Sequence, residues 1–339
     1  MAWRIPLPAA TGARLTVVLS LLALLLALSI GIGLFVGSQR LSPSSLLSDP
    51  FARALFFRLR LPRVVMALLI GASLAISGAA LQALFRNPLA EPYTLGVSGG
   101  GALGASVAIA LGWGVRLLGV PVIFLAAFAG ALAAVAFVRA LARSGAVALP
   151  GALLLAGVVV NLTCSAAVLM IQYIAAPNSA LQILRWIVGS LDVVGFSTVG
   201  QMLWLLLPAW MALLAFSPQL HLVAIDEDTA ASLGVNVRRC ETAVHLLCSL
   251  IVGVTVATGG AIAFVGLIVP HAVRLLFGQD LRIVLPGSLL LGAAFLVLAD
   301  ALARTALPSG ELPVGAITGL LGGPAFLWLL RRRQQNVVM

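Results

Sequence analysis

Lysine is absent from this chain of 339 residues, and all 20 basic residues are arginine. A phosphate-binding loop of the GxxxxGK[ST] type needs a lysine to hold the phosphates. The sequence therefore excludes a nucleotide site of that type. Charged residues make up only 9% of the chain, although the formal net charge is +10. The arginines stand at helix ends and in loops, and this placement does not indicate nucleic-acid binding.

Cysteine and histidine are also scarce, with three residues of each. The three cysteines lie inside apolar segments, which is typical of reduced packing residues. The three histidines are far apart and lack the spacing of metal ligands. No nucleophile stands in a pattern that would pair it with a base. We therefore expect neither an enzyme nor a metal site or cofactor in this chain.

Hydrophobic residues, by contrast, make up 62% of the chain, together with 34 glycines and 17 prolines. This composition predicts an all-α polytopic membrane protein whose helices are interrupted by glycine and proline, with 1–339 as a single transmembrane domain. Ten apolar stretches have about the length that a bilayer requires. They are 15–37, 62–84, 94–112, 117–138, 150–172, 195–215, 238–258, 261–277, 284–305 and 313–330. The first is too long for a signal-peptide core, so we expect it to be retained.

Arginine placement predicts the orientation in the membrane, because cytoplasmic loops collect basic residues. With both termini in the cytoplasm, 12 of the 20 arginines lie inside and the other 8 lie outside. The run of three arginines at 331–333 is the strongest anchor of this assignment. It places the acidic stretch 224–239 on the cytoplasmic side.

This acidic stretch is a polar island and predicts a short helix. Asp226 is suited to cap the N-terminus, Glu227 and Asp228 suit the positive end of the helix dipole, and Gly234 can end the helix. A helix of about two turns is not stable alone in water.

Two interpretations of this helix remain open. It is either a solvated turn between membrane helices or a docking helix for a cytoplasmic partner. In the second case Ala230, Leu233 and Val235 form its small apolar face.

The outer arginines are concentrated between Arg40 and Arg63. Contact with lipid headgroups explains some of them. For Arg60 and Arg63, which flank Pro62 at a helix start, we favour recognition of carboxylates on an external protein. Further along, Asp300 and Arg304 are four residues apart and can pair on one helix face.

An internal repeat follows the second and the seventh apolar stretch. The first copy reads SGAALQALFRNPLAEPYTLG and the second TGGAIAFVGLIVPHAVRLLFG, with Pro88 and Pro270 in comparable places. Five stretches separate the copies, so the units would be inverted relative to each other, as in many transporters. We expect half-repeats at about 62–172 and 238–330, joined by a cytoplasmic loop at about 216–237.

A polar stripe marks the fifth stretch. Gly157, Asn161, Ser165, Val168 and Gln172 share one helix face. Asparagine and glutamine are costly against lipid, so they line a transport pathway or make interhelical hydrogen bonds.

No carboxylate lies alone in the middle of a stretch, where an ion-driven carrier usually needs one. We therefore expect the energy source in a partner ATPase. An ion-coupled secondary carrier is the rival from another class, and a membrane scaffold without transport is a third possibility.

Seven motifs in order along the chain resemble one known family. They are RLPR at 60–63, SGAALQALFRNPLAEPYTLGVSGGGALG at 77–104, LLLAGV at 153–158, DEDTAASLGV at 226–235, AFVGLIVPH at 263–271, LADALAR at 298–304 and ELPVGAITGLLGGPAFLWLL at 311–330. Together they resemble the FecCD-type permease subunits of binding-protein-dependent ABC importers for iron chelates, haem and vitamin B12.

The resemblance implies a ten-helix subunit of the bacterial inner membrane that pairs with a second copy of itself. Two ABC ATPase subunits, which bind ATP and Mg, would dock from the cytoplasm. A periplasmic substrate-binding protein would dock from outside. The expected substrate is haem or a ferric siderophore, with vitamin B12 as the alternative.

The resemblance also implies roles for individual residues. The ATPase-coupling segment would consist of Asp226, Glu227, Asp228, Thr229, Ala230, Ala231, Ser232, Leu233, Gly234 and Val235. Arg60, Arg63 and Arg304 match positions that meet acidic residues of a binding protein. Asn87 and Leu89 match a cytoplasmic gate, and a second gate region lies near Pro150 and Gly151, where the sequence departs from the vitamin B12 permease.

Overall fold

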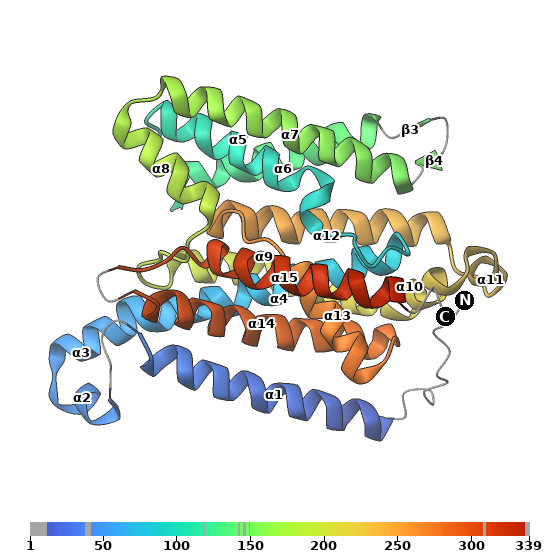
Figure 1. The fold of residues 1–339 in the computed structure, drawn as a ribbon, viewed down its shortest axis with the longest axis horizontal. Coiled ribbons are helices and arrows are strands. Elements are labelled where there is room, and N and C mark those ends of the chain that lie inside the picture. Colours follow the sequence, from blue (N-terminus) through green and yellow to red (C-terminus); the bar gives the residue numbers. More distant parts are fainter. Residues whose placement is uncertain are drawn as a thin grey trace.

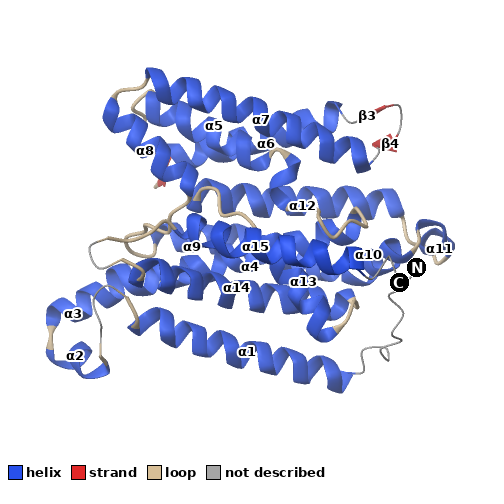
Figure 2. Cartoon of the chain, in the orientation of Figure 1, coloured by secondary structure: helices blue, strands red, loops and turns tan. Residues whose placement is uncertain are grey.

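The computed structural model describes residues 12–37, 42–117, 119–141, 143–144, 147–148, 150–307 and 310–335. Figure 1 shows a bundle whose long helices run roughly along one common direction. Apart from two hairpins of two-residue strands, its regular elements are helical, as Figure 2 shows. The predicted all-α class is confirmed.

The helices lie at α1 (Gly12–Phe35), α2 (Pro43–Ser48), α3 (Pro50–Leu55), α4 (Leu61–Leu84), α5 (Val97–Ala110), α6 (Val122–Leu141), α7 (Pro150–Ile174), α8 (Pro177–Val188), α9 (Ser197–Ala215), α10 (Ser217–Ile225), α11 (Glu227–Ser232), α12 (Val237–Gly259), α13 (Val265–Phe277), α14 (Leu281–Thr305) and α15 (Val314–Gln335). A π-helical turn, η1 (Phe56–Arg60), precedes α4, and a 3-10 turn, η2 (Pro92–Leu95), precedes α5. The strands pair as β1 (Arg116–Leu117) with β2 (Val120–Pro121) and β3 (Arg143–Ser144) with β4 (Val147–Ala148), both antiparallel.

Each of the ten predicted apolar stretches contains one helix. In the described part of the chain, seven helices are long and apolar enough to cross a membrane, and α5, α13 and α15 are shorter apolar helices. The second spanning helix is longer than the sequence predicts, because α3 and η1 continue into α4 and extend it back to Pro50.

Helix α4 forms the centre of the bundle and packs against α9, α12, α13 and α14. Its small residues allow backbones to come close, as is typical of membrane helices. A Cβ atom added at Gly78 would lie 1.9 Å from the carbonyl oxygen of Gly266 in α13. One added at Gly71 would lie 2.2 Å from the carbonyl oxygen of Gly292 in α14. These two crossings leave no room for any side chain.

The chain reverses direction just after α4 and again just after α12. Among the described residues, only Arg86 and Phe264 combine a side chain with positive φ, at 47° and 69°, and each lies at one of these reversals. Helix α4 runs toward the end of the bundle that carries α11, whereas α12 begins there and runs away from it (Figure 1). The two units therefore run in opposite directions, as the repeat predicts.

Candidate functional site

The acidic segment forms α11, a single short helix with a defined cap at each end. The Asp226 carboxylate accepts the backbone N–H of Thr229 at 2.7 Å. At the other end Gly234, with φ of 86°, donates to the Ala231 carbonyl, and Val235 donates to the Ala230 carbonyl. The predicted N-cap and helix end are confirmed. Hydrogen bonds from Thr229 hold the pKa of the Asp226 carboxyl below its ordinary value.

The two faces of α11 differ in solvent exposure. Ala230 is fully buried against the core, and Val235 is partly buried beside it. Ala230 is therefore not available to a partner in this structure, and the docking role of the predicted apolar face stays a prediction. Leu233, in contrast, is 63% exposed. The Glu227 carboxylate anchors the helix start by pairing with Arg86 at 2.8 Å.

The remaining side chains of the segment point to the solvent. Exposed together with Leu233 are Glu227, Asp228, Thr229, Ala231 and Ser232. The result is a rigid polar projection with one apolar side chain on it, at one end of the bundle (Figure 1).

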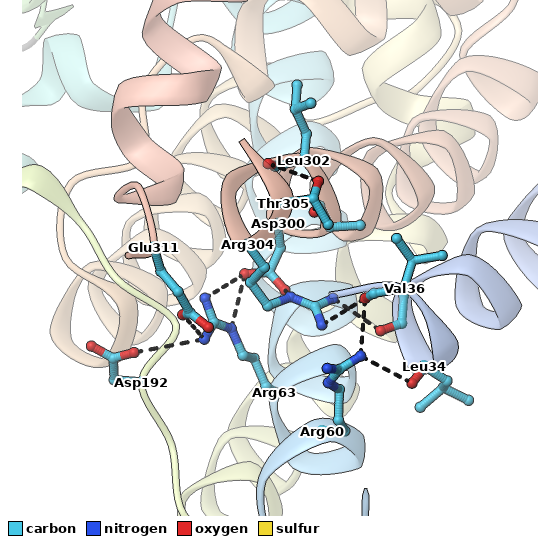
Figure 3. Close-up of polar contacts among 12 residues, drawn as sticks. Leu34, Val36, Arg60, Arg63, Asp192, Asp300, Leu302, Arg304, Thr305 and Glu311 are labelled. Carbon is cyan, nitrogen blue, oxygen red and sulfur yellow. Dashed lines mark hydrogen bonds and ion pairs between the residues drawn. The ribbon is translucent and has the colours of Figure 1, made fainter. Parts of the chain in front are cut away.

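At the opposite end of the bundle, the three predicted docking arginines gather in one cluster (Figure 3). Arg63 donates to Asp300 at 2.9 Å and to Glu311 at 2.5 Å. Asp192 approaches the same guanidinium at 3.9 Å. Arg304 pairs with the second oxygen of Asp300 at 2.9 Å, which confirms the predicted i, i+4 pair. The Asp300 side chain is 1% exposed, so this carboxylate is shared by two arginines inside the protein.

The other two arginines of this cluster hold the end of α1. Arg60 donates to the Val36 carbonyl at 3.0 Å, and Arg304 donates to the Val36 and Gly33 carbonyls at 3.0 and 2.9 Å. The last carbonyls of a helix have no partner within the helix, and positive charge is favourable there. Arg60 and Arg304 are both buried.

The role of the three arginines in docking stays a prediction, but the geometry separates them. Arg60 and Arg304 hold internal partners and offer no surface to an external protein. The Arg63 side chain is 16% exposed, and its outer partners Glu311 and Asp192 are 39% and 76% exposed. Of the three, Arg63 is the one within reach of an external carboxylate.

A second polar junction joins the two reversals of the chain. Glu91, just before η2, accepts the N–H of Phe264 at 2.6 Å. The Tyr93 hydroxyl accepts the N–H of Ile262 at 2.8 Å. The Gln82 amide, near the end of α4, donates to the Gly266 carbonyl at 3.1 Å. The non-helical backbone of one half-repeat is thus satisfied by the other, which allows irregular backbone at membrane depth.

Two of the predicted gate residues, Asn87 and Leu89, lie between α4 and η2, beside this junction. The Asn87 side chain accepts the N–H of Leu89 at 3.0 Å and shapes the turn after α4. Leu89 is 41% exposed. Pro150 and Gly151 begin α7. Their roles as gates stay predictions.

The polar stripe on α7 is divided between two uses. Asn161 fits the interhelical alternative, because its amide donates to the Tyr93 carbonyl at 2.6 Å and accepts the Gly99 N–H at 2.8 Å. Gln172 donates to the Ala180 carbonyl at 3.5 Å. Ser165 is exposed and keeps the pathway interpretation open.

Several residues of these sites were not predicted from the sequence, among them Arg86, which pairs with Glu227. Glu311 and Asp192 complete the cluster around Arg63, and Tyr93 joins the two reversals. A signal existed for Glu311, because it is the first residue of the motif ELPVG. An acidic residue in a loop motif is a hint of function. We found no comparable signal for Asp192.

Comparison with known proteins agrees with this architecture. The profile of the FecCD transport family matches residues 21–332. The hemin transport system permease protein HmuU of Yersinia pestis is 42% identical over 284 residues, 83% of this chain and 85% of that protein. The vitamin B12 import system permease protein BtuC of Salmonella typhi is 41% identical over 315 residues, 91% and 93% of the two chains.

A solved structure shows the same fold. An inward-facing conformation of a metal-chelate type ABC transporter aligns with a TM-score of 0.80 and 32% identity, covering 94% of this chain and 99% of that one. The family match, the relatives and the shared fold agree with the seven sequence motifs. This chain therefore belongs to the FecCD transport family of membrane permeases.

Proposed function

We propose that two copies of this chain form the membrane pathway of an ATP-driven importer for an iron chelate, either haem or a ferric siderophore. Two partner ATPases dock on the cytoplasmic side and hydrolyse ATP, and a binding protein delivers the substrate from the periplasm. The named substrates of HmuU and of the metal-chelate type transporter support this class of cargo.

The observation that carries the proposal is α11. A helix this short needs external support, and α11 has it from the Asp226 cap, the buried Ala230 and the Arg86–Glu227 pair. Most of its outer side chains are exposed in the described part of the chain, and a supported, exposed helix is suited to contact with another molecule. A preformed helix with one apolar anchor fits a groove on a partner protein.

Closure of the ATPase dimer would move α11 and shift the permease pair between outward and inward openings. Such a shift requires contacts that differ between the two states. The ATPase supplies them at α11, and the binding protein supplies them at the cluster around Arg63.

Substitution of Leu233 tests this assignment. We expect Leu233→Asp to abolish co-purification of the ATPase and ATP-dependent uptake, because it places a charge where the apolar anchor enters the partner. The folded permease should be unaffected, since Leu233 is 63% exposed. The matched control is Leu47→Asp, which alters an 82% exposed leucine in α2 at the other end of the bundle. Retained ATPase binding by Leu233→Asp would contradict the proposal, as would uptake driven by an ion gradient without any ATPase.

Vitamin B12 is the second candidate substrate, because BtuC aligns with a larger share of this chain, 91%, than HmuU does, at 83%. Titration of the partner binding protein with haem, ferric siderophores and cobalamin distinguishes the candidates. Tight binding of cobalamin alone would replace the iron-chelate assignment and leave the importer mechanism intact.

A further inference from the structure

A cavity of about 310 Å³ lies at the end of the bundle that carries α11. Its polar lining comes from several separate elements of the fold. These residues are Gln82, Arg86, His221, Arg274 and Gln279. Apolar side chains complete the wall, among them Ile225, which is 65% exposed at the rim. The cavity is therefore cationic inside and apolar at its edge.

Among the described residues, the guanidinium of Arg274 is the charge in this cavity that has no carboxylate partner. Arg86 pairs with Glu227, and the nearby Asp280 pairs with Arg282, both at 2.8 Å. Each of these carboxylates is thus already engaged. Arg274 hydrogen-bonds only neutral groups among its described partners, the side-chain oxygen of Gln82 and the carbonyl of Ala79.

Within the described part of the chain, no carboxylate forms an ion pair with Arg274. A partly buried guanidinium without a counter-charge is costly. An anion that enters the cavity would remove this cost. Arginine binds phosphate oxygens with paired, charge-assisted hydrogen bonds, and a basic pocket between membrane helices near the cytoplasmic boundary is suited to a lipid headgroup.

We propose that this cavity binds the phosphate group of an anionic membrane phospholipid, with Arg274 as its main charge partner. The acyl chains leave the cavity past the apolar rim at Ile225. The inference goes beyond the proposed transport function, and it uses only the orientation in which α11 faces the cytoplasm. Because lipid binding belongs to the permease alone, it can be tested without the ATPase.

The experiment measures lipids retained by the purified full-length chain. Mixed micelles carry phosphatidylglycerol or phosphatidylcholine with identical acyl chains, and native mass spectrometry counts the bound lipids. We expect the wild type to retain phosphatidylglycerol preferentially. Arg274→Gln should weaken that retention about tenfold, the usual effect of losing a charge-assisted hydrogen bond. The matched control Arg239→Gln also removes one arginine at this end, an exposed one in α12 outside the cavity, and should retain the lipid.

A second variant distinguishes loss of lipid binding from misfolding. It is needed because Arg274 also hydrogen-bonds Gln82 in α4. Gln279 is exposed, so Gln279→Glu leaves the packing unchanged and places a carboxylate at the cavity. It should lower phosphatidylglycerol retention as well. Equal retention by the wild type and both cavity variants would overturn the proposal.

Two further arms identify the source of the anion. Inorganic phosphate at millimolar concentration should not displace the lipid; if it does, and stabilises the protein alone, the cavity takes free phosphate. If Arg274→Gln lowers ATPase co-purification while lipid retention is unchanged, the cavity receives a partner carboxylate. Either result would overturn the lipid assignment, whereas failure of Leu233→Asp to release the ATPase would leave it untouched.

Discussion

The two ends of this permease use their charged residues in opposite ways. At the end with the arginine cluster, Asp300 and Arg304 are 1% and 3% exposed and are paired with each other. At the end with α11, Arg86 and Glu227 form one pair in which the side chains are 41% and 53% exposed. The central ion pair of the cluster is thus buried, whereas the ion pair beside α11 is exposed to solvent.

This difference indicates two modes of docking. At the α11 end, a partner can add contacts to a preformed surface without breaking any existing pair. At the cluster, an external carboxylate reaches Arg63 only by replacing Glu311 or Asp192. Because those acids lie on the loops before α15 and before α9, docking there would loosen both loops at once. The binding protein would then act on the fold by exchange of ion pairs, and the ATPase by direct contact.

Removal of the Asp300 carboxylate should have the largest effect. Asp300→Ala leaves Arg63 and Arg304 without their shared buried partner, and loss of one member of a buried pair typically costs about 3–5 kcal/mol. We expect a strongly lowered unfolding temperature and poor recovery of monodisperse protein in detergent.

Asp192→Ala is the control for this variant. The Asp192 side chain is 76% exposed and 3.9 Å from Arg63, so its loss should cost less than about 1 kcal/mol. Similar unfolding temperatures for the two variants would show that the cluster is not a buried network and would remove the contrast between the ends.

A side chain added where α4 crosses α13, between the two ends of the bundle, should give the next largest loss of stability. Gly78→Ala places a methyl group 1.9 Å from the Gly266 carbonyl oxygen, a contact that no side-chain rotation relieves. Overpacking of this kind costs about 1–3 kcal/mol. Gly200→Ala in α9 meets nothing within 4 Å and should be neutral or stabilising by up to about 1 kcal/mol.

Unfolding temperatures of the two alanine variants, measured side by side, test this prediction. If both variants unfold at the wild-type temperature, α4 and α13 are free to separate, and the crossing does not hold the half-repeats together.

The features predicted from sequence are those that depend on neighbours along the chain. The bilayer requires long apolar runs, so the ten stretches could be found from composition alone. The Asp226 cap and the Asp300–Arg304 pair span three and four residues, and helix geometry predicts both. Short helices such as α2 and α8 escaped prediction, because no bilayer thickness sets their length. For α8, Pro177 at its start and Gly189 at its end were usable signals.

The contacts that could not be predicted connect distant parts of the chain. Arg63 and Glu311 are 248 residues apart, and only the packing of α4 beside the α14–α15 connection brings them together. Asn161 shows the same limit. Its spacing on α7 indicated an inward face, but the Tyr93 carbonyl that accepts a hydrogen bond from its amide lies 68 residues earlier in the chain. Periodicity along a helix shows which of its faces points inward. The residue that contacts this face can be identified only once the arrangement of the helices is known.

If ion pairs are exchanged at the cluster, loss of a competing carboxylate should strengthen docking of the binding protein. This effect is smaller than the losses of stability described above. Glu311→Gln removes the carboxylate that competes for Arg63, so the binding protein should dock up to about fivefold more tightly, the contribution of one exposed pair. Surface-immobilised permease in nanodiscs and soluble binding protein provide the measurement.

Glu227→Gln, the same change at the α11 end, should leave this affinity unaltered. Weaker docking by Glu311→Gln would mean that Glu311 positions Arg63 for the partner and does not compete with it. That result would remove the proposed difference between the two modes of docking.

The smallest effect concerns the cap of α11 and its dependence on pH. The pKa of Asp226 is lowered in the folded helix, because Thr229 hydrogen-bonds the ionised carboxylate. The cap therefore stabilises α11 fully above the ordinary aspartate pKa, and its contribution is lost as the pH falls through the lowered value. Hydrogen exchange of the α11 amides, corrected for intrinsic rates, should show about fivefold more opening at pH 3 than at pH 6. Asp226→Ser retains a capping oxygen that does not titrate, so its protection should be independent of pH over this range. If the serine variant loses protection in acid as the wild type does, the cap is not the titrating element, and the exposed end owes its rigidity to the Arg86–Glu227 pair.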